Sequence, residues 1–370
     1  MVRRILRRFV HAAAADIERD LDRLSDILSA GESHSKQVRL LAYAGYRNDH
    51  EVRLRGRVVR YRKPLDAGEG TWSRMRAMLE IYNSHELSGI DVRLDGYGRT
   101  LDARTDAEGY FTFDFAPDAP LSAGTQWEAV ALSTPNTTMQ QPSASVPILA
   151  PGTDSHWGII SDIDDTVIET GATNFLKNWR RVLVEQPGDR LAVPGASTLY
   201  KVIAEDHVAP VRPFFYVSSS PWNLYGFLTE FMELNAIPHG PMFLKDYGID
   251  DNQFVSTGHG EHKLEAIKTI LAFYPGMKFL LIGDNGQHDV EIYSEAVRTY
   301  PARVAAVFIR DVSGTCCEGA RAGLLQGIEA AGVPTFCGAG FDDAVSVVKS
   351  LGLDRPLEVA KAVAEPAASA

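Results

Sequence analysis

Short runs in which apolar and polar residues alternate fill the first part of the chain, and longer apolar runs separated by helical periodicity fill the second part. Between residues 36 and 150 the alternating runs include residues 52–55 and 92–94, with turn residues between them. A period of two is typical of strands that bury one face. We therefore expect a smaller β-sandwich domain over residues 36–150.

Other segments refine this picture of the first part. Helical spacing of apolar residues over residues 12–30 and 71–82 predicts one helix before the sandwich and another within it. Residues 105–113 form a tight turn that leads into an aromatic strand, and they resemble the corresponding turn of transthyretin-like sandwiches. A stretch rich in Pro, Ser and Thr, residues 133–153, is typical of a linker, so we expect the domain boundary there.

The second part of the chain has the pattern of a parallel sheet covered by helices on both faces. The apolar runs of strand length are residues 157–160, 214–217, 279–282 and 304–309, and the clearest helical segments are residues 224–234, 263–273 and 342–351. Strands that are apolar at nearly every position indicate burial on both faces. We expect an α/β domain over residues 151–355 and a flexible tail over residues 356–370.

Composition and charge limit the partners and the compartment. The 370-residue chain carries a formal net charge of −11, whereas general nucleic-acid binders need a basic face that displaces counterions from phosphates. We therefore expect no nucleic acid among the partners. No run approaches the roughly 20 apolar residues that a transmembrane helix needs. The three cysteines have no metal-type spacing, which is typical of a reducing, cytoplasmic setting, so we expect no structural disulfide.

The N-terminal segment, residues 1–35, is basic and amphipathic at its start. Four arginines within residues 3–8 surround apolar side chains, and no acidic residue precedes Asp16. Such a segment can lie on an anionic membrane surface. A solvated helix that merely carries arginines explains the same pattern. Peripheral binding to a membrane is therefore one of two interpretations of this segment.

The strongest chemical signal is a cluster of carboxylates. Asp162, Asp164 and Asp165 come directly after an apolar run that ends near residue 160. In an open parallel sheet, ligands bind at the carboxyl ends of the strands. Carboxylates this close raise one another's pKa unless a cation neutralises them, and Mg²⁺ prefers such oxygen ligands. A calcium loop of the EF-hand type is excluded, because Val167 stands where that loop needs glycine.

Residues 162–166, Asp-Ile-Asp-Asp-Thr, resemble the first motif of haloacid dehalogenase-type phosphatases. That superfamily has three further motifs: a strand that ends in a hydroxyl residue, a lysine at the start of a helix, and a strand followed by two acids. The residues that fit them in order are Ser218 (or Ser219 or Ser220), Lys263, and the pair Asp284 and Asp289. Four motifs in the correct order over about 130 residues make the resemblance specific.

The particular residues within these motifs indicate one family of this superfamily. Residues 161–166, the serine-rich stretch of residues 218–224, Lys263 and residues 282–289 are similar to the catalytic domain of the actin-patch-associated (App1-type) phosphatidate phosphatases. The similarity covers residues 157–311. It implies a magnesium-dependent phosphatase with the Rossmann-like haloacid dehalogenase fold. The implied reaction hydrolyses phosphatidate, a lipid phosphomonoester, to diacylglycerol and phosphate.

The resemblance and the chemistry of phosphoryl transfer imply the same roles for the residues. Asp162 attacks phosphorus and becomes an aspartyl phosphate. Asp164 protonates the leaving oxygen and then activates water. The expected metal ligands are Asp162, the backbone carbonyl of Asp164, and Asp284; the groups that orient the phosphoryl oxygens are Ser218 and Lys263; the supporting residues are Thr166 and Asp289.

The substrate is less constrained than the reaction. About 50 residues separate Thr166 from Ser218 and about 40 separate Ser220 from Lys263, so neither usual insertion point holds a large cap domain. An open site suits a large phosphorylated substrate, such as a lipid headgroup at a membrane surface. Two alternatives are a phosphatase for a soluble or protein-bound phosphoester and an inert scaffold with this fold. Nothing in the sequence indicates the oligomeric state.

Overall fold

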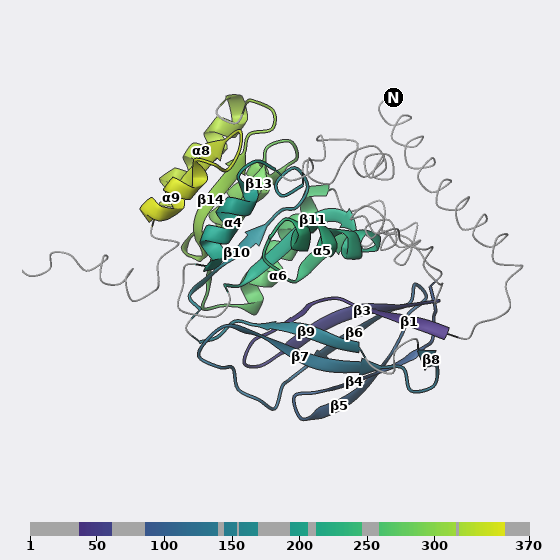
Figure 1. Cartoon of the computed structure of the whole chain (residues 1–370). Helices are drawn as coiled ribbons and strands as arrows, with labels where there is room; N and C mark the ends of the chain where they lie inside the picture. The colour runs from purple at the N-terminus through teal and green to yellow at the C-terminus, as the bar shows by residue number, and fades with distance from the viewer. Residues whose placement is uncertain are drawn as a thin grey trace, which may run out of the picture. The chain divides into compact units, whose positions relative to one another are not determined.

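The computed structural model describes residues 37–60, 86–139, 144–153, 155–168, 193–205, 212–245, 259–315 and 318–351 (Figure 1). The predicted segments at residues 1–35, 71–82 and 356–370 lie outside these residues. By their contacts, residues 38–370 form one compact unit. The predicted division of this unit near residue 150 stays a prediction.

The second part of the chain contains an all-parallel sheet. Its order is β12 (Met242–Lys245), β11 (Phe214–Pro221), β10 (Trp157–Ser161), β13 (Lys278–Asp284), β14 (Val304–Arg310) and β15 (Thr335–Gly338). The four apolar runs of the sequence are β10, β11, β13 and β14, and nearly every residue of these strands is buried. Burial on both faces explains why they show no alternation. The prediction of an α/β arrangement with a parallel sheet is confirmed.

Helices cover both faces of this sheet. They are α4 (Ala196–Glu205), α5 (Tyr225–Leu234), α6 (His259–Phe273), α7 (Asp289–Thr299), α8 (Gly319–Ala330) and α9 (Ala344–Leu351). Neighbouring residues of β10 enter different cores: Ile159 packs with α4, α5 and α9, and Ile160 packs with α6, α7 and α8. The three predicted helices correspond to α5, α6 and α9. Within the described residues, none of these helices has the length and apolarity needed to cross a membrane.

The first part of the chain contains a mainly antiparallel sheet. Its path runs through β5 (Arg99–Arg104), β4 (Asp91–Gly96), β7 (Gln126–Ser133), β9 (Ala144–Ala150), β2 (Gly45–Arg47), β3 (Val52–Arg60), β1 (Gln37–Ala42) and β8 (Thr138–Met139), and β6 (Tyr110–Phe115) pairs with β3. The pairing of β2 with β9 is parallel. The alternating runs are therefore strands, as predicted, and their packing as a sandwich stays a prediction.

The predicted linker is wrong over residues 144–150. These residues form β9, which pairs with β7 on one side and with β2 on the other. Val146 and Ile148 have an exposed fraction of 0%. These two apolar residues are two positions apart, so they give the strand one buried face. This alternation favours a strand even though the residues around them are small or polar.

The expectation of no structural disulfide is also wrong. Cys337, in the edge strand β15, is disulfide-bonded. The other cysteines of the chain, Cys316 and Cys317, lie outside the described residues. Sequence spacing could not reveal this bond, because the position of Cys337 is set by the pairing of β15 with β14, where Cys337 lies opposite Ile309. The cysteines therefore no longer argue for the predicted reducing, cytoplasmic setting.

The two sheets share buried cores. The residues of the first part that enter the cores of the second part are Leu41, Tyr43, Val59, Tyr110 and Leu149. At the same boundary the ring of Tyr46 lies edge-on to Phe273, with centroids 4.8 Å apart. The hydroxyl of Tyr274 donates to the carbonyl of Arg47 at 3.2 Å. Each part thus completes the burial of the other.

Replacing Tyr46 by alanine should therefore lower the free energy of unfolding of both sheets together, by about 2–3 kcal/mol, because the lost ring leaves a cavity where the two parts meet. Differential scanning calorimetry should show a single transition that shifts as a whole. Two separate transitions, or a shift in only one of two, would show that the sheets fold independently.

Candidate active site

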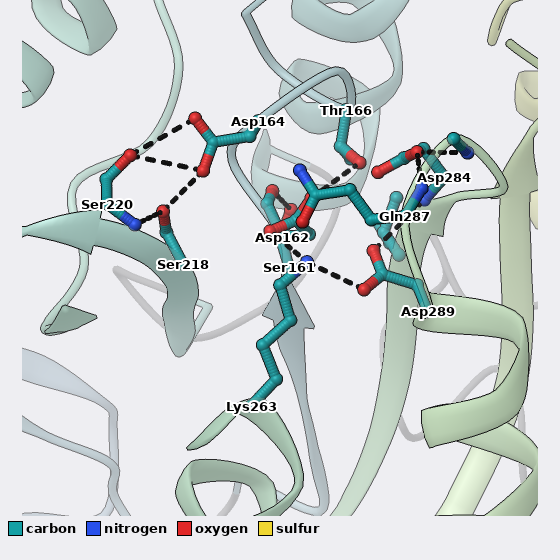
Figure 2. A network of polar contacts seen from close by, with 12 residues as sticks. Ser161, Asp162, Asp164, Thr166, Ser218, Ser220, Lys263, Asp284, Gln287 and Asp289 are labelled. Atoms are coloured by element: carbon teal, nitrogen blue, oxygen red, sulfur yellow. Dashed lines mark hydrogen bonds and ion pairs between the residues drawn. The ribbon is translucent and has the colours of Figure 1, made fainter. Parts of the chain in front are cut away.

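Every residue expected at the site lies at the carboxyl edge of the parallel sheet (Figure 2). The residues are Asp162, Asp164 and Thr166 after β10, Ser218 in β11, Lys263 in the first turns of α6, Asp284 at the end of β13, and Asp289 at the start of α7. Their exposed fractions run from 0% to 4%. The structure therefore gathers one buried group of charges from four separate stretches of sequence.

Asp162 stands at the centre of this group. Its backbone N–H donates to the carbonyl of Ile282 at 2.8 Å, which extends the pairing of β10 with β13 by one residue. Oδ1 of its carboxylate lies 2.9 Å from Nζ of Lys263. Oδ2 accepts a hydrogen bond from Oγ1 of Thr166 at 3.3 Å. The carboxylate is thus held from two sides at the end of a central strand.

Asp164 points towards β11 (Figure 2). Its Oδ2 accepts from Oγ of Ser218 at 2.6 Å, and both of its carboxylate oxygens lie 3.2 Å from Oγ of Ser220. The N–H of Ser220 donates to Oγ of Ser218 at 2.8 Å. The sequence left open which of three serines faces the site. The contacts with Asp164 come from Ser218 and Ser220.

Asp289 connects the lysine to the loop after β13. Its Oδ1 accepts from Nζ of Lys263 at 2.7 Å, and its Oδ2 accepts from the N–H of Asp284 at 3.2 Å. Oδ1 of Asp284 accepts from the N–H groups of Gly286 and Gln287, at 2.5 and 3.1 Å. Its Oδ2 is buried and has no hydrogen-bond partner among the described residues. Asp284 therefore keeps one carboxylate oxygen available.

Burial dominates the electrostatics of the group. It raises the pKa of Asp162 and of Asp164, and with the nearby Asp289 it raises the pKa of Asp284 to about 7. Burial alone would lower the pKa of Lys263, but the carboxylates of Asp162 and Asp289 outweigh it and raise that pKa. Lys263 therefore stays charged and faces more negative groups than it can neutralise.

The carboxylates fit a divalent cation. Asp162, Asp284 and Asp289 each offer an oxygen within 4.8 Å of the others. A hard cation such as Mg²⁺ takes oxygen ligands and would offset the excess negative charge. Both oxygens of Asp289 already accept hydrogen bonds, and both oxygens of Asp162 have a partner, whereas Asp284 keeps one oxygen without a hydrogen bond among the described residues. The free Oδ2 of Asp284 is the atom that most clearly needs a positive partner.

Two residues of this region were not singled out from the sequence. Arg310, at the end of β14, is 7% exposed and donates from Nη1 to the carbonyl of Asp165 at 2.8 Å. Asp165 has a φ of 58°, a left-handed conformation that few residues other than glycine adopt. Arg310 thus supports the turn between Asp164 and Thr166. Gln287 points its side-chain amide towards Asp162 in Figure 2.

A usable signal for Arg310 exists in the sequence. The arginine directly follows the apolar run of residues 304–309, and a charge at the carboxyl end of a buried parallel strand faces the same edge as the aspartates. Gln287 lies between Asp284 and Asp289, inside the fourth motif. Its backbone N–H binds Asp284, which keeps its side chain close to the site.

The chain is similar to known proteins in the segment that contains the motifs. Residues 157–311 match the family described as "Phosphatidate phosphatase APP1, catalytic domain". The predicted family resemblance is confirmed. The APP1-type segment contains all of the site residues above and begins with β10.

Two relatives give the extent of the similarity. Phosphatidate phosphatase APP1 of Saccharomyces cerevisiae is 35% identical over 161 residues, which are 44% of this chain and 26% of the relative. An uncharacterised protein of Schizosaccharomyces pombe is 27% identical over 219 residues, 58% of this chain and 35% of the relative. The chain thus spans only about a quarter to a third of the length of these relatives.

A solved structure shows only a distant likeness. The crystal structure of a carbohydrate acetylesterase from Xanthomonas citri aligns with 72% of this chain and 66% of its own, at 10% identity and a TM-score of 0.25.

Magnesium should stabilise the protein more at about pH 8 than at about pH 5.5. A carboxyl with a raised pKa contributes stability at low pH that is lost as pH rises through that pKa, here about 7 for Asp284. Mg²⁺ removes this loss by neutralising the carboxylate. The measurement is the difference in Tm between excess magnesium and excess EDTA at each pH.

The variant Asp284→Asn provides the control for this prediction. It removes both the titrating group and a ligand, so the magnesium effect should be small at both pH values. An equal gain in Tm at both pH values for the unaltered protein would contradict a role for Asp284 in binding the metal.

Proposed function

We propose that the protein is a magnesium-dependent phosphatase of the haloacid dehalogenase type, acting through an aspartyl phosphate on Asp162 and hydrolysing phosphatidate. The α/β part would have the Rossmann-like fold of that superfamily, and the first sheet would be the smaller β-sandwich. One observation carries the proposal: the buried carboxylate of Asp162, at the end of β10, lies 2.9 Å from Lys263 with Asp164 and Asp284 beside it.

In the first step an oxygen of Asp162 attacks phosphorus, a P–O bond to the carboxylate forms, and the bond to the leaving oxygen breaks. Lys263 neutralises charge on the phosphoryl oxygens, and its positive charge favours the ionised form of Asp162 against the effect of burial. Ser218 orients the phosphoryl group. Bound Mg²⁺, held by Asp162, Asp284 and the backbone carbonyl of Asp164, would supply further positive charge to the phosphoryl group.

Asp164 handles the protons in both steps. Burial raises its pKa, which favours the protonated form that gives its proton to the leaving oxygen. The hydroxyls of Ser218 and Ser220 then stabilise the carboxylate that remains. This carboxylate takes a proton from water, and the water oxygen forms a bond to phosphorus. The bond from phosphorus to the Asp162 oxygen breaks, which releases phosphate and restores the carboxylate of Asp162.

The substrate follows from the family and from the surroundings of the site. The name of the yeast relative supports phosphatidate, a phosphorylated lipid that lies at a membrane surface. Residues 1–35 would bring the enzyme to that surface. The alternatives are a soluble or protein-bound phosphoester and an inert scaffold; the complete set of Asp162, Asp164, Lys263 and Asp284 argues against the scaffold.

One experiment tests the function. Phosphate release is measured with and without magnesium on phosphatidate vesicles, a soluble aryl phosphate and a phosphopeptide. We expect magnesium-dependent release that is fastest on the vesicles, and essentially none from Asp162→Asn, because the amide is not nucleophilic. If Asp162→Asn keeps more than about a tenth of the activity, the nucleophile is another group. Faster release from the phosphopeptide would replace the lipid by a protein substrate.

Asp164→Asn should lower turnover by roughly 100- to 10,000-fold, because the amide cannot exchange the proton. The loss should be smaller for aryl phosphates with good leaving groups, since these need little protonation. Steady-state kinetics on a series of aryl phosphates with different leaving groups checks this. A loss that is the same across the series would rule out the role of Asp164 as the acid.

A further inference from the structure

Arginines line one face of β3. Arg53, Arg55 and Arg57 alternate with buried residues, and side chains two positions apart lie on the same face of a strand. A polar face of this kind usually meets water. Here it also contacts the α/β part: the guanidinium carbon of Arg53 lies 5.1 Å from the ring centroid of Phe273, and that of Arg55 lies 5.3 Å from the ring centroid of Trp222.

Arg57 makes the most specific of these contacts. It is 5% exposed. Its Nη1 donates to Oδ1 of Asn223 at 2.8 Å, its Nε donates to the carbonyl of Glu108 at 2.9 Å, and its Nη2 pairs with the carboxylate of Glu86. Because all three nitrogens are engaged, the orientation of the guanidinium is fixed. Asn223 is therefore held by a rigid group of the first sheet.

Aromatic side chains anchor the same segment. The ring of Trp222 stacks on that of Tyr43 with centroids 4.4 Å apart, and the ring of Tyr225 packs against Tyr43 at 4.6 Å. The hydroxyl of Tyr225 accepts from the N–H of Ala44 at 2.8 Å. The three rings are at most 8% exposed. Residues 222–225 are thus fixed to the first part of the chain by stacking and by hydrogen bonds.

This anchored segment begins two residues after Ser220. Strand β11 pairs with β12 at Tyr216 and Val217 and again at Pro221, with a register shift between them. Its pairing with β10 reaches only to Tyr216. Residues 218–220 therefore lie in the register shift between the two paired parts of the strand, where the regular ladder is interrupted. Their position depends on what holds the segment that follows.

We propose that Arg57 is a positioning residue for catalysis. By holding Asn223, it sets the place of Ser218 and Ser220, and these two hydroxyls set the direction of the Asp164 carboxylate. The inference gives the first sheet a part in the reaction. It rests on the proposed function, in which Asp164 protonates the leaving oxygen.

The test compares two soluble substrates that differ in leaving group. Arg57→Gln should lower kcat/KM for phenyl phosphate by roughly 10- to 100-fold, because a small displacement of a catalytic group has effects of this size. The loss should be smaller for p-nitrophenyl phosphate, whose leaving group needs the proton of Asp164 less. A variant that merely contained less folded protein would lose activity on both substrates in the same proportion.

Variants at the partner residue make the test independent of how Arg57→Gln folds. Asn223→Leu removes the acceptor oxygen and should reproduce the unequal loss, whereas Asn223→Asp keeps an acceptor and should restore the ratio of the two substrates. The double variant Arg57→Gln/Asn223→Leu should lose no more kcat/KM than the more impaired of the two single variants, because both substitutions break the same contact. The matched control is Arg93→Gln, which breaks an exposed pair with Asp102 in the same sheet and should leave both activities unchanged.

Two results would overturn the inference. They are equal losses on the two substrates in Arg57→Gln and Asn223→Leu, or activity equal to that of Arg93→Gln. Neither result would touch the proposed function, which depends on Asp162. If Asp162→Asn is inactive but the ratio of kcat/KM for the two substrates is unchanged in Arg57→Gln, the proposed phosphatase activity is supported and the positioning role of Arg57 is contradicted.

Discussion

The two ion pairs of Lys263 are the interaction on which the site depends. Its ammonium group lies 2.9 Å from Asp162 and 2.7 Å from Asp289, and all three side chains are buried. Removing one partner of such a buried group leaves an uncompensated charge, which typically costs about 3–5 kcal/mol. The same contacts join α6 to the end of β10 and to the start of α7. The ion pairs that balance the buried charges therefore also fix the positions of α6, α7 and the end of β10.

A glycine makes this close arrangement sterically possible. A Cβ at Gly283 would lie 2.5 Å from Oδ2 of Asp289 and 2.7 Å from the hydroxyl of Tyr293. Any larger residue would displace the side chains of Asp289 and Tyr293, and with them the hydrogen bond from the N–H of Asp284 to Asp289. The hydroxyl of Tyr293 also donates to the carbonyl of Ile282 at 2.8 Å. The glycine of the fourth motif is thus explained by packing against acids and an aromatic ring.

The sequence predicted the central strands, and it predicted which residues would gather at one edge of the sheet, because the signals for both lie in short stretches of sequence. The apolar runs around Ile159 and Leu281 are strands, and the ordered motifs brought Asp162 together with Lys263. It failed where the structure depends on long-range contacts. Cys337 is disulfide-bonded, and its position depends on the pairing of β15 with β14. The edge strand β12 has only four residues, which is too short a run to show a period.

The arginine face of β3 shows the same limit most clearly. Alternation predicts which residues of a strand share a face, but it does not say what covers the polar face. Arg57 therefore looks like a surface residue in the sequence, although Asn223 binds it within the fold. At β9 the opposite error occurred. Its small and polar residues suggested an exposed linker, although Val146 and Ile148 are buried in a strand.

The shared core also bears on how such a chain can change over generations. The APP1-type segment begins at residue 157, yet Tyr43 and Leu149 belong to the cores that bury its helices. A gene fragment that carried only this segment into a new protein would arrive with Trp222 and Phe273 uncovered. Its new neighbour would need to supply an aromatic stack and a hydrogen-bond donor for Asn223. Burial of the matched segment in this chain therefore depends on a sheet that lies outside the match.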